Sequence, residues 1–277
     1  MTEADVVDIA RRIHAHDVSL WGTTPETQSI VGQRLGWLDA PDWLNENREE
    51  LTTWARDIHG QGFVRVVVLG MGGSSLAAQA LAGVLGKTEQ GLPLVVLDTT
   101  HPEAIASTAA AASLSETLFI SASKSGTTIE VSALTAYFYQ QVKAELGSAA
   151  GENFVAITDA GSALQHYAEA HDFRRCFLNP ADVGGRFSVL TAFGMVPAAL
   201  LGLDLERMFC SAYAARAASE VDTPDAGPSA LRLGQAMARS ALAGRNKLTL
   251  LLSPQLGAFS VWVEQLVAES TGKSGIG

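Results

Sequence analysis

Residues 121–128 read SASKSGTT and crowd five hydroxyl side chains and one lysine into eight positions. Hydroxyl groups and exposed main-chain amides donate hydrogen bonds to phosphate oxygens, and Lys124 adds a positive charge. A capped and solvated helix start would explain one or two of these hydroxyls. Five hydroxyls beside a lysine favour a loop that binds phosphate.

A second polar loop, LGMGGSSL at 69–76, also follows an apolar run. Its three glycines allow a tight turn and a close approach of the backbone, and Ser74 or Ser75 can cap a following helix. The N-terminus of such a helix attracts anions. The loop does not fit the dinucleotide pattern, because Ser75 stands where that pattern has its third glycine. Taken alone, a structural turn with a serine cap is the favoured interpretation.

Two further segments carry charged side chains that could take part in chemistry. Arg186 follows Gly184 and Gly185 and precedes an apolar helix, so it is either a packed stem with a solvated head or a clamp for an anion. Gln265 and Glu269 are four residues apart and share one helix face. A carboxylate at the end of a helix opposes the helix dipole, which is unfavourable unless it serves a purpose. A surface glutamate remains the alternative interpretation.

The elements that position these residues alternate between strands and helices. Continuous apolar or β-branched runs predict five buried strands, at 64–70, 92–98, 117–123, 154–159 and 172–178. Helical patterns separate them at 75–86, 128–146 and 162–170. This order predicts an α/β fold with a doubly wound, flavodoxin-like parallel sheet of five strands. The two polar loops then lie at the carboxyl ends of strands, where such sheets bind ligands.

The flanking regions read differently. Residues 1–60 have helical periodicity and predict an N-terminal helical arm. An apolar helix follows residue 186, and Pro197 should either kink this helix or end its first part. The run KLTLLLS at 247–253 predicts one more strand, which cannot form a sheet alone. We therefore expect a helical segment at 1–60, a first α/β domain at 61–203, and a helical linker with the incomplete start of a second α/β domain at 204–277.

Composition limits the class of protein. The 277 residues are 47% hydrophobic and 17% charged, with a formal net charge of −10, which argues against a nucleic-acid partner. The two cysteines have no metal-ligand spacing, so neither a zinc site nor a disulfide framework is expected. No apolar run reaches membrane-spanning length, and the N-terminus lacks the features of a signal peptide. We expect a cytoplasmic protein without a membrane partner, a metal or a cofactor.

Four segments, in order along the chain, resemble the glucose-6-phosphate isomerase family: GMGGSSL, SASKSGTT, VGGRFSVLTAFGMVP and QLVAESTGK. The likeness covers about residues 62 to 277, and it implies the sugar isomerase (SIS) domain that this family contains twice. It implies substrate-binding roles for Gly73, Ser74, Ser123, Lys124, Ser125, Thr128 and Gln265. Ser121 is a weaker alternative to Ser123, and Ser125 replaces the more usual threonine. The short helical N-terminus resembles the isomerase portion that is fused to transaldolase in some bacteria.

The resemblance also implies a reaction and a partner. Family members interconvert glucose 6-phosphate and fructose 6-phosphate in glycolysis and gluconeogenesis, through a cis-enediolate and as homodimers. Glu269 would be the general base, and Arg186 would stabilise the anionic enediolate. The phosphate, held by the two loops, would orient the reacting carbons of a hexose 6-phosphate. No metal is needed for this chemistry.

The sequence also departs from the family in the groups that follow the base glutamate. The family's ring-opening histidine and a C-terminal lysine both follow the base glutamate, and none of the six histidines here has a matching position. We therefore expect this chain to be weak or inactive as a catalyst. Two alternatives stay open: a sugar-phosphate-binding SIS module without catalysis, and a different SIS sugar-phosphate isomerase. The acidic N-terminus disfavours the first, and the segments GGRFS and QLVAESTGK disfavour the second.

Overall fold

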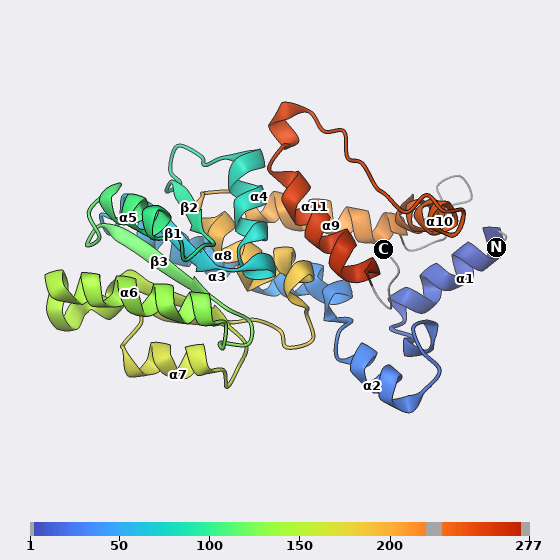
Figure 1. Ribbon diagram of the computed structural model, residues 1–277, viewed down its shortest axis with the longest axis horizontal. Coiled ribbons are helices and arrows are strands. Elements are labelled where there is room, and N and C mark those ends of the chain that lie inside the picture. Colours follow the sequence, from blue (N-terminus) through green and yellow to red (C-terminus); the bar gives the residue numbers. More distant parts are fainter. Residues whose placement is uncertain (1–2, 220–228, 273–277) are drawn as a thin grey trace.

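The computed structural model describes residues 3–219 and 229–272, and their centre is one parallel sheet (Figure 1). Its strands are β1 (Arg65–Gly70), β2 (Leu94–Leu97), β3 (Thr117–Ala122), β4 (Phe154–Thr158) and β5 (Arg175–Leu178). They lie in the order β2-β1-β3-β4-β5, and every neighbouring pair is parallel. The predicted flavodoxin-like sheet is therefore confirmed.

Helices cover both faces of the sheet because successive side chains of a strand point to opposite faces. Val66 and Val68 of β1 pack with α3 (Ala40–His59) and α8 (Ala192–Leu200). Val67 and Leu69 face α5 (Pro102–Ala110) and α6 (Ile129–Leu146). α7 (Ala163–Ala170) packs on β4, and α4 (Leu76–Leu85) contacts α8 and β2. The six residues of β1 and of β3 are all buried, which explains their continuous apolar sequence.

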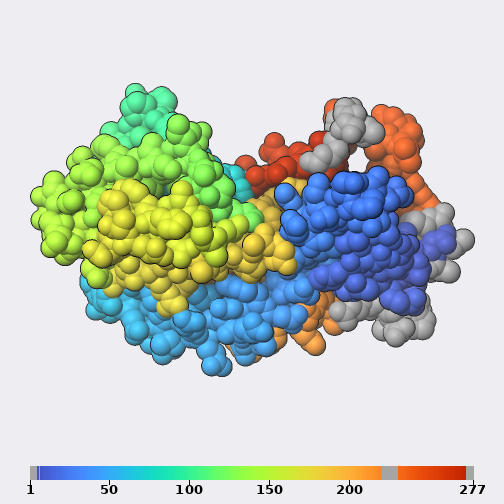
Figure 2. Space-filling view, turned by 90° about the horizontal axis from the view of Figure 1, so that it is seen from below, coloured from blue at the N-terminus to red at the C-terminus, as the bar shows by residue number. Residues whose placement is uncertain are grey.

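The N-terminal region is helical, as predicted. It contains α1 (Glu3–His14), α2 (Pro25–Gly32) and α3, with short 3-10 turns at Val18–Leu20 and Gly36–Asp39. Figure 2 shows α1 and α2 in blue at one end of the molecule, beside orange and red segments that follow residue 200, while α6 and α7 form the other end.

The segment after the sheet corrects one of the two alternatives for Pro197, namely that the proline ends a first part of the helix. A 3-10 turn, Gly185–Leu190, precedes α8, and the break between them falls at Thr191. α8 then runs through Pro197 to Leu200 instead of ending at the proline. Nearly every side chain of α8 is fully buried, so the surrounding core holds the helix despite the amide that proline lacks.

The rest of the chain is helical, with α9 (Leu205–Ser219), α10 (Ser229–Leu242), a 3-10 turn at Pro254–Leu256 and α11 (Phe259–Thr271). The predicted strand at 247–253 is wrong, because these residues have no regular secondary structure. A strand needs a neighbouring strand for its hydrogen bonds, and the five strands of the described residues all belong to the central sheet. Leu251 is 93% exposed as a result. None of the described helices has the length and apolar character needed to cross a membrane.

Candidate active site

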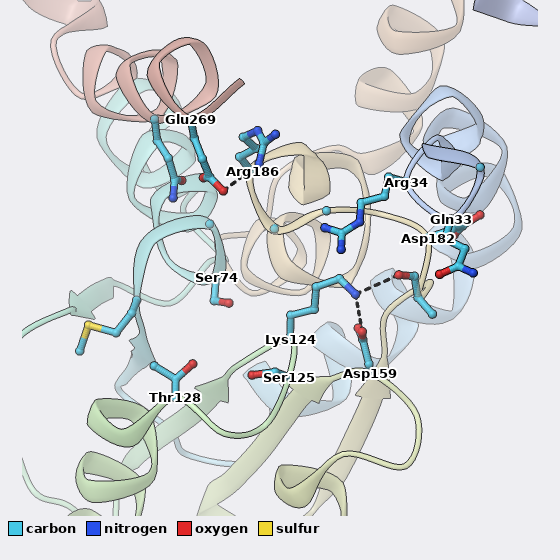
Figure 3. A pocket seen from close by; sticks show the side chains of 17 residues that line it. Gln33, Arg34, Ser74, Lys124, Ser125, Thr128, Asp159, Asp182, Arg186 and Glu269 are labelled. Atoms are coloured by element: carbon cyan, nitrogen blue, oxygen red, sulfur yellow. Dashed lines mark hydrogen bonds and ion pairs between the residues drawn. The ribbon is translucent and has the colours of Figure 1, made fainter. Parts of the chain in front are cut away.

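A cavity of about 760 Å³ lies at the carboxyl end of the sheet, where the loops after β1, β3, β4 and β5 meet α11 (Figure 3). Its walls include eight of the nine residues that the sequence singled out. These are Gly73, Ser74, Lys124, Ser125, Thr128, Arg186, Gln265 and Glu269. Gly73 and Glu269 therefore line the same cavity although 196 positions separate them in the sequence.

The loop after β1 is a 3-10 turn, Gly72–Ser74, packed against the loop that carries Arg186. A Cβ added at Gly73 would lie 2.4 Å from the carbonyl carbon of Gly185, so only glycine allows this approach. Ser75 occupies the N-cap position of α4, but its hydroxyl donates to the carbonyl oxygen of Gly72 at 3.1 Å and makes no cap bond. Ser74 lines the cavity instead.

The loop after β3 turns at Gly126, which has a φ of +68°. A Cβ at this position would lie 2.6 Å from the amide nitrogen of Leu164, so both the backbone angle and the space require glycine. Thr128 is the N-cap residue of α6 and makes no side-chain cap bond. Since the first amides of a helix have no partner within the helix, those of α6 are available to an anion beside Ser125 and Thr128.

Ser123 is the one predicted site residue that does not line the cavity. It is 2% exposed, and its hydroxyl donates to Oγ1 of Thr128 at 3.1 Å. Ser121, the weaker alternative, is fully buried in β3 against the hydroxyl of Thr135. Both serines point away from the cavity because they continue the alternation of the strand. Ser123 acts here on the position of Thr128.

Lys124 is held by partners that the sequence did not reveal. Its ammonium group donates to the Asp159 carboxylate and, at 2.9 Å, to the carbonyl oxygen of Ala181. Asp159 follows β4 directly, so its place at the carboxyl end of a predicted strand was a signal that could have identified it. Its second oxygen, Oδ1, is buried and has no hydrogen-bond partner among the described residues. Asp159 therefore competes with any anion that approaches Lys124.

Arg186 and Glu269 meet across the other side of the cavity. Nη1 of Arg186 lies 2.8 Å from Oε1 of Glu269, and Nε donates to the hydroxyl of Ser270 at 2.9 Å. The Glu269 side chain is 50% exposed, which leaves it accessible to a ligand. Gln265, one turn earlier on α11, lies close to Gly72, and its buried Oε1 has no partner among the described residues. Lys273, the last residue of the QLVAESTGK segment, lies outside the described residues.

Other polar side chains also line the cavity without having been predicted, namely Gln33, Arg34 and Asp182. Gln33 and Arg34 come from the connection between α2 and α3, which the sequence placed only within a helical arm. Nothing in their local pattern could have linked them to loops so far along the chain. Conversely, all six histidines lie in the described part of the chain and none lines the cavity. The described residues contain no cluster of three or more His, Cys, Asp or Glu side chains that could hold a metal ion.

Comparisons with known proteins find relatives that match most of this chain. The family model described as phosphoglucose isomerase matches residues 47–275. Among curated relatives, the glucose-6-phosphate isomerase of Symbiobacterium thermophilum is 33% identical over 258 residues, covering 87% of this chain and 56% of the relative. A glucose-6-phosphate isomerase of Thermus thermophilus is 31% identical over 248 residues, with the same two coverages. The chain thus spans about half the length of the curated relatives it matches.

Solved structures show the same fold. A hypothetical protein from Thermus thermophilus superposes with a TM-score of 0.78 at 28% identity, covering 98% of this chain and 61% of that one. A glucose-6-phosphate isomerase from Chlamydia trachomatis superposes with a TM-score of 0.73 at 20% identity, covering 98% and 55%. The family match extends over most of the chain and includes every predicted site residue. This chain therefore belongs to the phosphoglucose isomerase family.

Proposed function

We propose that this chain carries the phosphate-binding and proton-transfer groups of a glucose-6-phosphate isomerase. The observation that carries the proposal is the composition of one cavity. A hydroxyl-rich loop at the N-terminus of α6 lies on one side, and a carboxylate paired with an arginine lies on the other. An aldose–ketose isomerase that acts on a phosphorylated sugar needs both kinds of group.

The substrate's phosphate binds to the loop after β3. Ser125, Thr128 and the first amides of α6 donate to its oxygens, and Lys124 contributes charge. Ser123 keeps Thr128 in place through the hydroxyl contact at 3.1 Å. Gly73 and Ser74 approach the ligand from the loop after β1. Binding of the phosphate supplies energy that orients the carbons to be isomerised.

The groups that we propose for proton transfer lie on the opposite wall of the cavity. Glu269 removes the proton from C2 of the open-chain aldose and returns it to C1, while the hydroxyl proton of O2 moves to O1. The reaction therefore passes through a cis-enediolate. The guanidinium of Arg186 stabilises the negative charge of that intermediate, and Gln265 contacts the sugar from the same helix face as Glu269. No described histidine lines the cavity to open the sugar ring, so ring opening belongs to a group from elsewhere.

The wider setting follows from the family likeness. We propose a homodimer in the cytoplasm that acts in glycolysis and gluconeogenesis, with a hexose 6-phosphate as substrate. We also propose the division at residues 1–60, 61–203 and 204–277, in which the last part begins a second sugar isomerase domain. The central sheet and α8 lie between residues 65 and 200, whereas Leu248, Leu250 and Leu251 of the last part are exposed.

The test measures proton transfer directly. The chain is incubated with fructose 6-phosphate in D₂O, and deuterium at C1 is followed by NMR beside a coupled assay for glucose 6-phosphate. Because some of the ketose opens without help, exchange at C1 reports on the base even if turnover is weak. We expect exchange that falls about 1,000-fold in Glu269→Gln. Glu264→Gln is the matched control, because Glu264 is on the same helix but does not line the cavity.

Exchange lost in Glu269→Gln and retained in Glu264→Gln supports the proposal. Equal rates in the two variants would remove Glu269 from the role of base. Binding of the sugar phosphate with no exchange in the unmodified chain would favour the module without catalysis.

A further inference from the structure

The guanidinium of Arg34 lies at the cavity, although Arg34 belongs to none of the four motif segments of the sequence. It belongs to the turn that joins α2 to α3, and Figure 3 shows its guanidinium pointing into the cavity on the side where Lys124 lies. The side chain makes no hydrogen bond or ion pair with the described residues, although its main-chain amide donates to the carbonyl oxygen of Val31 at 2.8 Å. An arginine aimed into a ligand cavity without a protein partner indicates a contact made by the ligand.

The charges of the cavity favour an anionic ligand group for Arg34. Among the described side chains that line the cavity there are three cations, Arg34, Lys124 and Arg186. Lys124 is paired with Asp159, and Arg186 is paired with Glu269. Arg34 alone of the three has no carboxylate partner in the described residues. A phosphate dianion entering the cavity therefore meets Arg34 as the lining cation that is not held in an ion pair, although the Asp182 carboxylate also lines the cavity.

The turn that carries Arg34 is fixed to the wall of the cavity. The amide of Gly36 donates to the carbonyl oxygen of Asp182 at 3.3 Å, and a Cβ on Gly36 would lie 2.3 Å from Cγ of Asp182. Trp37 stacks on Phe187 with ring centroids 5.3 Å apart. The guanidinium of Arg186 also contacts the Phe187 ring, 4.9 Å from its centroid. The turn and the loop that carries Arg186 are therefore packed together.

These contacts determine where Arg34 can reach. Leu35 and Leu38, on either side of the glycine contact, are 5% and 7% exposed, so the segment is buried on the side away from the cavity. Since the backbone is anchored, the loss of freedom on ligand binding is confined to the arginine side chain.

We propose that Arg34 binds the phosphate group of the substrate, together with Lys124, and that the N-terminal helical arm is thereby a part of the substrate site. The proposal rests on the function proposed above and extends it. A guanidinium binds phosphate through two parallel N–H···O bonds, which an ammonium group cannot reproduce. Arg34 accordingly selects phosphorylated sugars over neutral ones.

The experiment is isothermal titration calorimetry at low ionic strength. It measures the affinity for sorbitol 6-phosphate, sorbitol and inorganic phosphate as separate probes. Sorbitol 6-phosphate is acyclic and does not react, so binding is measured without ring opening or turnover. The proteins are the unmodified chain, Arg34→Ala, Arg34→Lys and Arg56→Ala. Arg56 is an exposed arginine of α3 outside the cavity and serves as the charge-matched control. Thermal unfolding verifies that each variant is folded.

We expect Arg34→Ala to weaken binding of sorbitol 6-phosphate and of inorganic phosphate about 10- to 100-fold. The affinity of Arg34→Lys should lie between those of Arg34→Ala and the unmodified chain, and the affinity of Arg56→Ala should equal that of the unmodified chain. Unchanged binding by Arg34→Ala, with binding still lost in Lys124→Ala, would overturn the inference and leave the proposed function standing. An effect on sorbitol 6-phosphate but not on inorganic phosphate would place Arg34 on the sugar and overturn its assignment to phosphate. If the unmodified chain binds no phosphorylated probe, both proposals fail.

Discussion

Arg186 and Glu269 form an ion pair across the candidate active site, with Nη1 and Oε1 2.8 Å apart, although 83 residues separate them in the sequence. The same guanidinium donates from Nε to the hydroxyl of Ser270 at 2.9 Å. Arg186 thus ties the loop after β5 to the C-terminal end of α11 through two different atoms. The ion pair places the proposed base and the proposed stabiliser of the enediolate in direct contact.

Arg186→Lys tests whether the forked shape of this side chain matters, because lysine keeps the charge but cannot make both contacts. We expect exchange of deuterium at C1 of fructose 6-phosphate to fall about 100-fold, since a donor to developing negative charge is displaced. The free energy of unfolding should change by less than about 1 kcal/mol, because Glu269 is half exposed and such pairs stabilise little. Exchange at the original rate would show that charge alone suffices.

Lys124 and Asp159 should affect phosphate binding in opposite directions. Lys124→Ala removes a cation from the cavity and should weaken binding of sorbitol 6-phosphate by at least about tenfold. Asp159→Asn removes the carboxylate that competes for Lys124 and should strengthen binding by about 2- to 5-fold at low salt. Titration calorimetry checks both. A weaker affinity in Asp159→Asn would mean that the carboxylate positions Lys124 for the ligand and does not compete with it.

Gly73→Ala tests the contact between the loop after β1 and the loop that carries Arg186. The added methyl group would lie 2.4 Å from the carbonyl carbon of Gly185 and 2.7 Å from the amide nitrogen of Arg186, so one loop must move. We expect a loss of about 1–3 kcal/mol in the free energy of unfolding, together with weaker ligand binding.

The control for that substitution is Gly234→Ala, in the interior of α10, where an added Cβ meets nothing within 4 Å. It should stabilise the protein by up to about 1 kcal/mol, because alanine favours the helix. Thermal unfolding measures both variants. Similar melting temperatures for the two alanine variants would show that the loops adjust to the methyl group without cost.

The two cysteines should react with iodoacetamide at very different rates. Burial, with a smaller effect from Glu169, raises the pKa of Cys176 to about 11 from a usual value of 9.0, whereas Cys210 is exposed on α9. A raised pKa keeps the thiol protonated as the pH increases, so at pH 8 about one Cys176 side chain in a thousand is the reactive thiolate. Mass spectrometry over time should show Cys210 modified first. The reaction of Cys176 should accelerate as the pH increases from about 8 towards 10. Equal rates in the native protein at the lower pH would contradict the burial of Cys176.

Local sequence was sufficient to determine the sheet and its loops. The run RVVVLG in β1 is rich in β-branched valine and favours a strand buried on both faces, and its strand-to-helix context placed the polar loops at the carboxyl ends of the strands. Eight of the nine site residues chosen from the sequence line the cavity for that reason, since each lies in such a loop or on the helix face opposite. Ser123, the ninth chosen residue, does not line the cavity, because the alternation of side chains along the strand decides which way each one points.

Packing between distant segments decided the rest. Arg34 reaches the cavity because Gly36 and Trp37 dock on the loop at 182–187, and Asp159 reaches Lys124 because β3 and β4 are neighbours. The run at 247–253 has the composition of a strand and yet forms none, because a strand exists only where a second backbone completes its hydrogen bonds. The sequence by itself determined the properties that depend on neighbours along the chain. These are the periodicity of buried side chains, the turns and the starts of helices. The tertiary structure decided which charges meet, because a contact between residues far apart in sequence is set by how the elements pack and not by either local pattern.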